Sequence, residues 1–272
     1  MNFFSVVLIQ PLANGLILFY KLLGQNMGLA LIAFTLFLKF ATNPLTRPYM
    51  NSMKKIKDLS PQLEKLKERH KGDKVKFAQA QADLYKEKKV NPGAGCIPYI
   101  LQIVVLIAFF NVFTKTIGNG GNIVENFNKL LYEPLRFSEN ESVNTKFLYM
   151  DISKPDKLSL PGVNFPLPGP ILLLAAITQL ISAKVMNPYV DKEKKLAAKT
   201  KESSDDIQVA MQKSMMFTFP LFTILIGMNF ASGLALYWLT FSVSQVVQQV
   251  RAQGWGELLP LIAKLKLIKS IT

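Results

Sequence analysis

The sequence contains a single cysteine, Cys96, and a single histidine, His70. One cysteine excludes an internal disulfide and a cysteine-rich zinc site, and one histidine excludes a multi-histidine metal centre. P-loop, HExxH and GxSxG motifs are absent, and a Ser-His-Asp triad would have to use His70, which lies in a highly charged segment. We therefore expect no catalytic site, no metal and no cofactor.

Charged residues, and acids above all, are also scarce. They make up 18% of the 272 residues, against about 25% in a typical soluble domain. There are 18 Asp and Glu against 32 Lys and Arg, while half of the chain is hydrophobic. This balance disfavours a soluble enzyme or a disordered chain. Because the basic residues lie between long apolar runs, it favours a polytopic, all-α membrane protein over a protein that reads a nucleic-acid sequence.

The apolar runs predict five transmembrane helices within a core at residues 26–250. A helix needs about 20 apolar residues to cross the hydrocarbon, and three runs are of that order: 27–44, 97–113 and 171–185. The run 215–250 is too long for one crossing. We expect it to divide at the small, polar segment Asn-Phe-Ala-Ser-Gly, residues 229–233.

Residues 1–25 are apolar but interrupted, and they predict an amphipathic helix lying in the membrane interface. Asn14 and Lys21 fall away from the predicted apolar face. That face comprises Leu12, Leu16, Phe19, Tyr20 and Leu23. The alternative is a sixth, broken span.

The distribution of Lys and Arg predicts the orientation. Segments 47–95, 184–213 and 248–272 hold 13, 7 and 4 of them, whereas segment 114–170 holds 6, balanced by 6 acids. The positive-inside rule then places a hairpin at 50–92, a loop at 186–213 and a short basic tail at 251–272 in the cytoplasm. The N-terminus and the loop 114–170 are expected outside.

Segment 50–92 is too long for a simple connector, and its apolar residues recur at helical spacing on both sides of Gly72. It predicts a basic helical hairpin. Its charges could be merely solvated, or they could form a docking surface for anionic headgroups, a ribosome or another partner. The candidate docking residues are Lys54, Lys55, Lys57, Lys65, Lys67 and Arg69.

Lys39 lies inside the first predicted span, where a charge costs roughly 2.5–3.5 kcal/mol. No acid lies in any predicted span, so no salt bridge between spans can offset it. One interpretation is that its ammonium snorkels to the cytoplasmic side. The other is a wet, positive cavity, because polar side chains share its helix face and amides occur in other spans. These side chains are Thr35, Thr42, Asn43 and Thr46 beside Lys39, with Gln102, Gln179 and Gln245 elsewhere.

Several segments, in order, resemble the YidC-type membrane protein insertases of bacteria, mitochondria and chloroplasts. They are KFATNP at 39–44, LSPQL at 59–63, VNPGAGCIP at 90–98, FLYMDISKPD at 147–156 and GLALYW at 233–238. The resemblance implies a bacterial inner-membrane protein with a hydrophilic groove that is open to cytoplasm and lipid.

In that family, a basic groove residue attracts the acidic tail of a hydrophobic client, which then passes into lipid without nucleotide. The resemblance implies this role for Lys39, with Gln179, Trp238 and Gln102 lining the groove. Nascent membrane proteins and the lipid bilayer are the implied partners, with a ribosome and the Sec translocon as further candidates. The family usually has Arg where this chain has Lys39, and many members have a large extracytoplasmic domain and a C-terminal extension that we do not expect here.

Two other functions fit the sequence less well. An anion or small-solute transporter could use Lys39, but the outer half of its helix, residues 28–34, is wholly apolar and the chain shows no internal repeat. A lipid-modifying enzyme would need an acid, histidine or metal cluster, and the sequence shows none.

Overall fold

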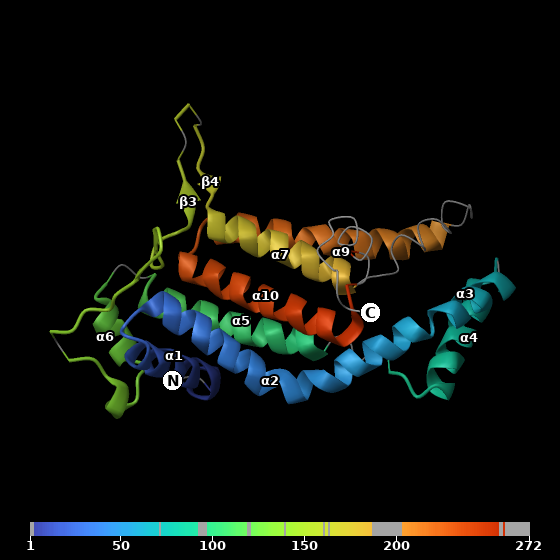
Figure 1. Ribbon diagram of the computed structural model, residues 1–272, viewed down its shortest axis with the longest axis horizontal. Helices are drawn as coiled ribbons and strands as arrows, with labels where there is room; N and C mark the ends of the chain where they lie inside the picture. Colours follow the sequence, from blue (N-terminus) through green and yellow to red (C-terminus); the bar gives the residue numbers. More distant parts are fainter. Residues whose placement is uncertain are drawn as a thin grey trace, which may run out of the picture. The chain divides into compact units, whose positions relative to one another are not determined.

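The computed structural model describes residues 3–70, 72–91, 97–118, 121–138, 140–159, 161–162, 164–186, 203–255 and 258. Most of the predicted loop 186–213, most of the tail 251–272, and the segment around Cys96 lie outside these residues. The described part of the chain is mainly helical (Figure 1).

The helices and strands follow one another in this order. The π-helix η1 (Ser5–Ile9) leads into α1 (Gln10–Leu22), α2 (Met27–Asp58), α3 (Ser60–Arg69), α4 (Lys74–Glu87) and α5 (Ile97–Thr116). Next come α6 (Ile123–Asn128), the 3-10 helix η3 (Glu133–Leu135), and strands β1 (Lys146–Phe147), β2 (Met150–Asp151), β3 (Lys157–Leu158) and β4 (Leu167–Pro168). The last helices are α7 (Pro170–Met186), α9 (Ser203–Gly227) and α10 (Ser232–Gln253).

The chain forms two compact units. The core unit comprises residues 1–41, 103–184 and 214–247, and the hairpin unit comprises 42–102, 185–213 and 248–272. In the hairpin unit α3 contacts α4, and the Asp73 side chain caps α4 by accepting a hydrogen bond from the Lys76 amide.

Aromatic side chains join three helices of the core unit. The ring of Phe109 on α5 stacks on Tyr237 of α10 with centroids 4.6 Å apart, and it lies 6.0 Å from Phe34 of α2. All three residues are almost fully buried. Rings of this size bury large apolar areas, so this contact fixes how α2, α5 and α10 pack.

Other helix faces of the core unit expose large apolar side chains. On α9, Phe219, Leu221, Phe222 and Leu225 are each more than half exposed, and Ile177 on α7 is half exposed. A water-soluble protein rarely exposes so many apolar residues together. These faces suit contact with lipid tails.

Two described segments are long and apolar enough to cross a membrane by length and composition, Ser5–Leu22 and Met27–Thr46. Shorter apolar helices cover Leu101–Thr116, Pro170–Val185 and Met216–Gly227. The predicted spans overlap four of these five segments, and the predicted break at 229–233 is confirmed, since α9 ends at Gly227 and α10 begins at Ser232. The count of five spans stays a prediction.

The predicted apolar face of the N-terminal helix was wrong at two positions. Asn14 is buried and Leu23 is exposed. The Asn14 amide donates to the Leu130 carbonyl over 3.1 Å and accepts from the Tyr132 amide over 2.7 Å. Because these bonds replace the ones that water would make, a polar residue can occupy the packed face.

The connecting loop, residues 117–169, belongs to the core unit, and its described parts include both strand pairs. Strand β1 pairs with β2 and β3 pairs with β4, each antiparallel. Phe147 lies so close to Gly28 at the start of α2 that a Cβ there would overlap its ring. Glycine at position 28 therefore allows the close approach of loop and helix.

Candidate functional site

Lys39 lies in the core unit against α10. Its ammonium donates a hydrogen bond of 3.1 Å to Oε1 of Gln245 and lies 3.9 Å from the centroid of the Phe241 ring. Phe241 and Gln245 are four residues apart on α10, so they lie on one helix face. An amide oxygen and a ring face both favour a cation. The structure thus brings together two of the candidate groove residues, Lys39 and Gln245.

The side chains predicted to lie beside Lys39 are in different surroundings. Thr35 is buried, and its hydroxyl donates to the Leu31 carbonyl of its own helix over 2.6 Å. Thr42 and Asn43 are half-buried, and both belong to the hairpin unit. The Asn43 carbonyl accepts a hydrogen bond from the Thr46 hydroxyl.

The remaining candidates come from three helices. Gln179 of α7 accepts a 2.9 Å hydrogen bond from the Thr223 hydroxyl of α9, and Thr223 is buried. Trp238 of α10 is buried in the core unit, whereas Gln102 of α5 is half-buried and belongs to the hairpin unit. The hydrogen bond between Gln179 and Thr223 thus joins α7 to α9.

The candidate docking residues lie on α2 and α3. Lys54, Lys55, Lys65 and Arg69 are exposed, and Lys67 is half-buried. The Lys57 side chain lies outside the described part. Exposed cations can attract an anionic surface, but the same exposure fits a solvated face.

A sequence model of the family described as 60Kd inner membrane protein matches residues 18–255. The chain belongs to this family. The match covers Lys39, both strand pairs and every candidate groove residue. It confirms the resemblance drawn from the sequence segments.

Curated relatives named membrane protein insertase YidC align with most of the chain. A protein of Pelagibacter ubique is 34% identical over 92% of this chain and 39% of its own length. One of Pelobacter propionicus is 32% identical over 90% and 38%, and one of Fusobacterium nucleatum is 30% identical over 82% and 84%. The chain thus spans about two fifths of the first and second of these relatives and most of the third.

The sequence analysis did not predict two contacts of candidate residues: Phe241 beside Lys39, and Thr223 beside Gln179. In the sequence, Phe241 is one of many apolar residues of its helix. The only signal was its spacing of four residues from Gln245. Thr223 is a polar residue in the apolar helix α9, which is a usable signal. Their partners could not be identified from sequence, because they lie on helices distant along the chain.

A polar cluster where the connecting loop meets α7 was also missed. The Asp156 carboxylate is buried and accepts from the Tyr149 hydroxyl over 2.8 Å and from the Leu172 amide over 3.0 Å. The Tyr149 hydroxyl accepts in turn from the Ile171 amide. Burial, with the nearby Asp156 carboxylate, raises the pKa of Tyr149 to about 12. The hydroxyl therefore stays protonated at neutral pH and the cluster caps α7.

Among the described residues, no group of three or more His, Cys, Asp or Glu side chains could hold a metal ion.

Proposed function

We propose that this chain is a membrane protein insertase. A short-tailed hydrophobic client would be received beside Lys39 and released into the bilayer. The observation that carries this proposal is the position of Lys39, whose ammonium is held between Gln245 and Phe241 inside an apolar helix. The family membership and the name shared by its relatives support the same function and do not favour the transporter.

The surroundings of Lys39 suit entry from lipid. The neighbouring side chains Leu36, Phe37 and Phe40 are 43%, 53% and 79% exposed. A client's apolar segment could slide along these side chains while its polar tail meets the ammonium. A cation in a medium of low dielectric attracts an acid far more strongly than it does in water.

Two free-energy terms would then drive insertion of the client without a catalytic step. Moving the client's apolar segment into lipid releases roughly 25 cal/mol per Å² of apolar surface. The membrane potential favours outward movement of a negative tail by about 2.3 kcal/mol per charge per 100 mV. Neither term needs a nucleotide or a cofactor.

The predicted topology belongs to this proposal. Five spans with the N-terminus outside and the C-terminus in the cytoplasm would open the Lys39 region toward the cytoplasm. Residues 1–25 would lie in the interface, although Ser5–Leu22 is long enough to cross. The basic hairpin at 50–92 would be a docking arm for anionic headgroups, a ribosome or another partner, because its exposed cations match acidic or phosphate-rich surfaces.

The test is reconstitution of the purified chain in liposomes with a single-span client that carries an acidic tail. Protection of the tail from external protease measures insertion. We expect protection with the wild type, a loss of about tenfold for Lys39→Ala or Lys39→Glu, and little change for Lys39→Arg, because a charge-assisted contact is worth roughly 1.5–3 kcal/mol.

Lys157→Ala is the matched control, since Lys157 is exposed on β3. Equal insertion by Lys39→Glu and the control would discard Lys39 as the groove residue and keep the insertase. Wild-type protection no greater than in empty liposomes would overturn the insertase function.

A further inference from the structure

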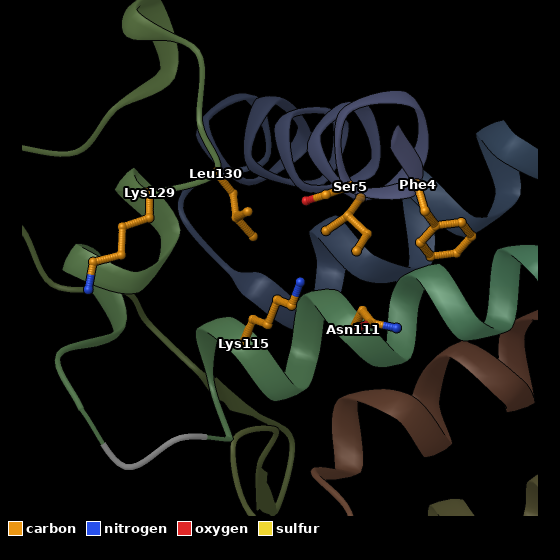
Figure 2. A pocket seen from close by; sticks show the side chains of 7 residues that line it. Phe4, Ser5, Asn111, Lys115, Lys129 and Leu130 are labelled. Carbon is orange, nitrogen blue, oxygen red and sulfur yellow. The ribbon is translucent and has the colours of Figure 1, made fainter. Parts of the chain in front are cut away.

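A cavity of about 420 Å³ lies in the core unit between η1, the end of α5 and α6. Figure 2 shows it from close by. Its lining includes Phe4, Ser5, Asn111, Lys115, Lys129 and Leu130. None of these residues belongs to the candidate groove, so the cavity needs an explanation of its own.

Ser5 provides the first sign of a polar occupant. Its side chain lines the cavity, and the residue is only 8% exposed. Within the described residues its hydroxyl has no hydrogen-bond partner. A buried hydroxyl without a partner is unfavourable, so a polar group in the cavity would satisfy it.

The two lysines of the cavity differ in their partners. Lys129 forms an ion pair of 2.8 Å with Glu125, and its amine points away from the cavity in Figure 2. Lys115, in the last turn of α5, has no ion pair or hydrogen bond from its ammonium within the described residues. Its amine points toward η1. Lys115 is exposed at the cavity, so the unpaired charge there is positive and selects an anion.

The apolar surface beside the cavity indicates what else the anion carries. Ile103, Ile107, Asn111 and Lys115 recur every four residues and form one stripe along α5. Ile103 and Ile107 are 48% and 46% exposed, so the stripe changes from exposed aliphatic to amide to ammonium toward the helix end. Asn111 donates one N–H to the Ile107 carbonyl, which leaves its second N–H to donate. An acyl chain would follow the isoleucines and an acidic headgroup would reach Lys115.

We infer that this cavity is a binding site for the phosphate headgroup of an anionic phospholipid. The phosphate lies between the Lys115 ammonium and the Ser5 hydroxyl, and its acyl chain follows Ile107 and Ile103 on α5. A bound lipid would tie η1 to α5 at a point distant in sequence from Lys39. The inference is independent of the insertase proposal, because it rests only on residues that the groove does not use.

The test compares lipid retention by the purified, delipidated chain in detergent, measured by native mass spectrometry. The probes are phosphatidylglycerol and phosphatidylcholine. The variants are Lys115→Gln, Ser5→Ala and the control Lys157→Gln, with Lys115→Arg as the conservative rescue. We expect the wild type, the control and Lys115→Arg to retain phosphatidylglycerol in preference, and Lys115→Gln to lose about tenfold in affinity. Ser5→Ala should lose less.

A free phosphate ion could satisfy the same side chains, so a second arm adds inorganic phosphate as competitor. Failure of millimolar phosphate to displace the lipid supports the lipid site, and displacement overturns it in favour of a soluble anion. Equal retention by Lys115→Gln and Lys157→Gln also overturns it, as does displacement by an acidic client peptide. Equal thermal midpoints of the variants show that Lys115→Gln is folded.

Discussion

The connecting loop of residues 117–169 and the hairpin of α3 and α4 are both polar parts of a membrane protein. The loop is held by hydrogen bonds to residues distant in sequence, whereas the hairpin has hydrogen bonds between near neighbours. In the loop, the Leu130 carbonyl and the Tyr132 amide bind Asn14, which is more than a hundred residues away. In the hairpin, Asp73 binds Lys76 and Gln81 donates to Tyr85, and both bonds are local.

The second attachment of the loop is to α10. The Ser232 amide donates to the Lys154 carbonyl over 2.7 Å, and the Gly233 amide donates to the Ile152 carbonyl over 3.0 Å. Ile152 is fully buried, and Gly233 is so close to Phe113 that a Cβ would overlap its ring. The loop is thus built into the core of its unit.

This difference indicates which of the two regions can open locally without unfolding the unit to which it belongs. Bonds between distant residues tie a segment to global unfolding, whereas bonds within one helical turn can break and re-form locally. We therefore expect changes in the loop to act on the whole core unit and changes in the hairpin to stay local. The docking arm that we propose would gain from the second arrangement.

The largest effect is expected from Asp156→Ala. The change leaves the buried Leu172 amide without its acceptor, and the hydroxyl of the half-exposed Tyr149 loses its acceptor as well. An unsatisfied buried donor costs about 1–3 kcal/mol, so we expect a loss of about 3 kcal/mol that comes mainly from the Leu172 amide. The measurement is the free energy of unfolding in detergent micelles.

Asp73→Ala is the matched control, because Asp73 also caps a helix but is exposed. Its effect should be confined to faster amide exchange in the first turn of α4. If both changes lowered the free energy of unfolding equally, the contrast between loop and hairpin would be lost.

A smaller effect is expected from Asn14→Ala, at about 2 kcal/mol. The change strands the carbonyl of the buried Leu130 and the amide of Tyr132. Amide exchange should rise in both α1 and residues 130–132, since the two segments share these bonds. Asn229→Ala should leave exchange at both segments unaltered, because the Asn229 side-chain amide donates to the Leu225 carbonyl of the preceding helix α9. Exchange confined to α1 alone would show that the loop is held independently of Asn14.

Helix positions and breaks were largely predictable from the sequence, because they depend on neighbouring residues. The small, polar segment at 229–233 correctly marked the end of α9, and the apolar run from Met27 correctly marked the start of α2. The end of α2 was not predicted. The expected span stopped at Pro44, but the helix continues through Pro44 and Pro48 to Asp58. Each proline removes one backbone donor, and the helix tolerates both losses.

Tertiary partners were less predictable. The single charge of Lys39 within an apolar run made it a candidate site residue, and its role stays a prediction. Its contact with Gln245 spans 206 positions, and no local pattern encodes that distance. The sequence wrongly predicted that Asn14 lies outside the packed face, because its partners, the Leu130 carbonyl and the Tyr132 amide, are also distant along the chain. The significance of the Ser5 hydroxyl likewise depends on the cavity beside it, and only the fold shows that cavity.

The smallest effect is a difference in acid sensitivity between Asp151 in the loop and Asp73 in the hairpin. Partial burial raises the pKa of the Asp151 carboxyl, but hydrogen bonds from Ser153 and Thr145 outweigh it and hold the pKa below its usual value. The Lys76 amide and ammonium likewise lower the pKa of Asp73. Groups with lowered folded-state pKa values contribute stability above the unfolded value, near 4, and lose it as pH falls through the folded value.

Both aspartates should therefore lose their contribution below about pH 4, but only one loss should reach the whole core unit. Thermal midpoints from pH 6 to pH 3 should fall in the wild type and in Asp73→Asn alike. They should fall less in Asp151→Asn, because that side chain no longer titrates. The Asp151 carboxylate binds Ser153 beside the segment that holds α10, whereas Asp73 binds only its own helix. A flatter pH profile for Asp73→Asn than for Asp151→Asn would reverse the assignment of local and global stability to these two regions.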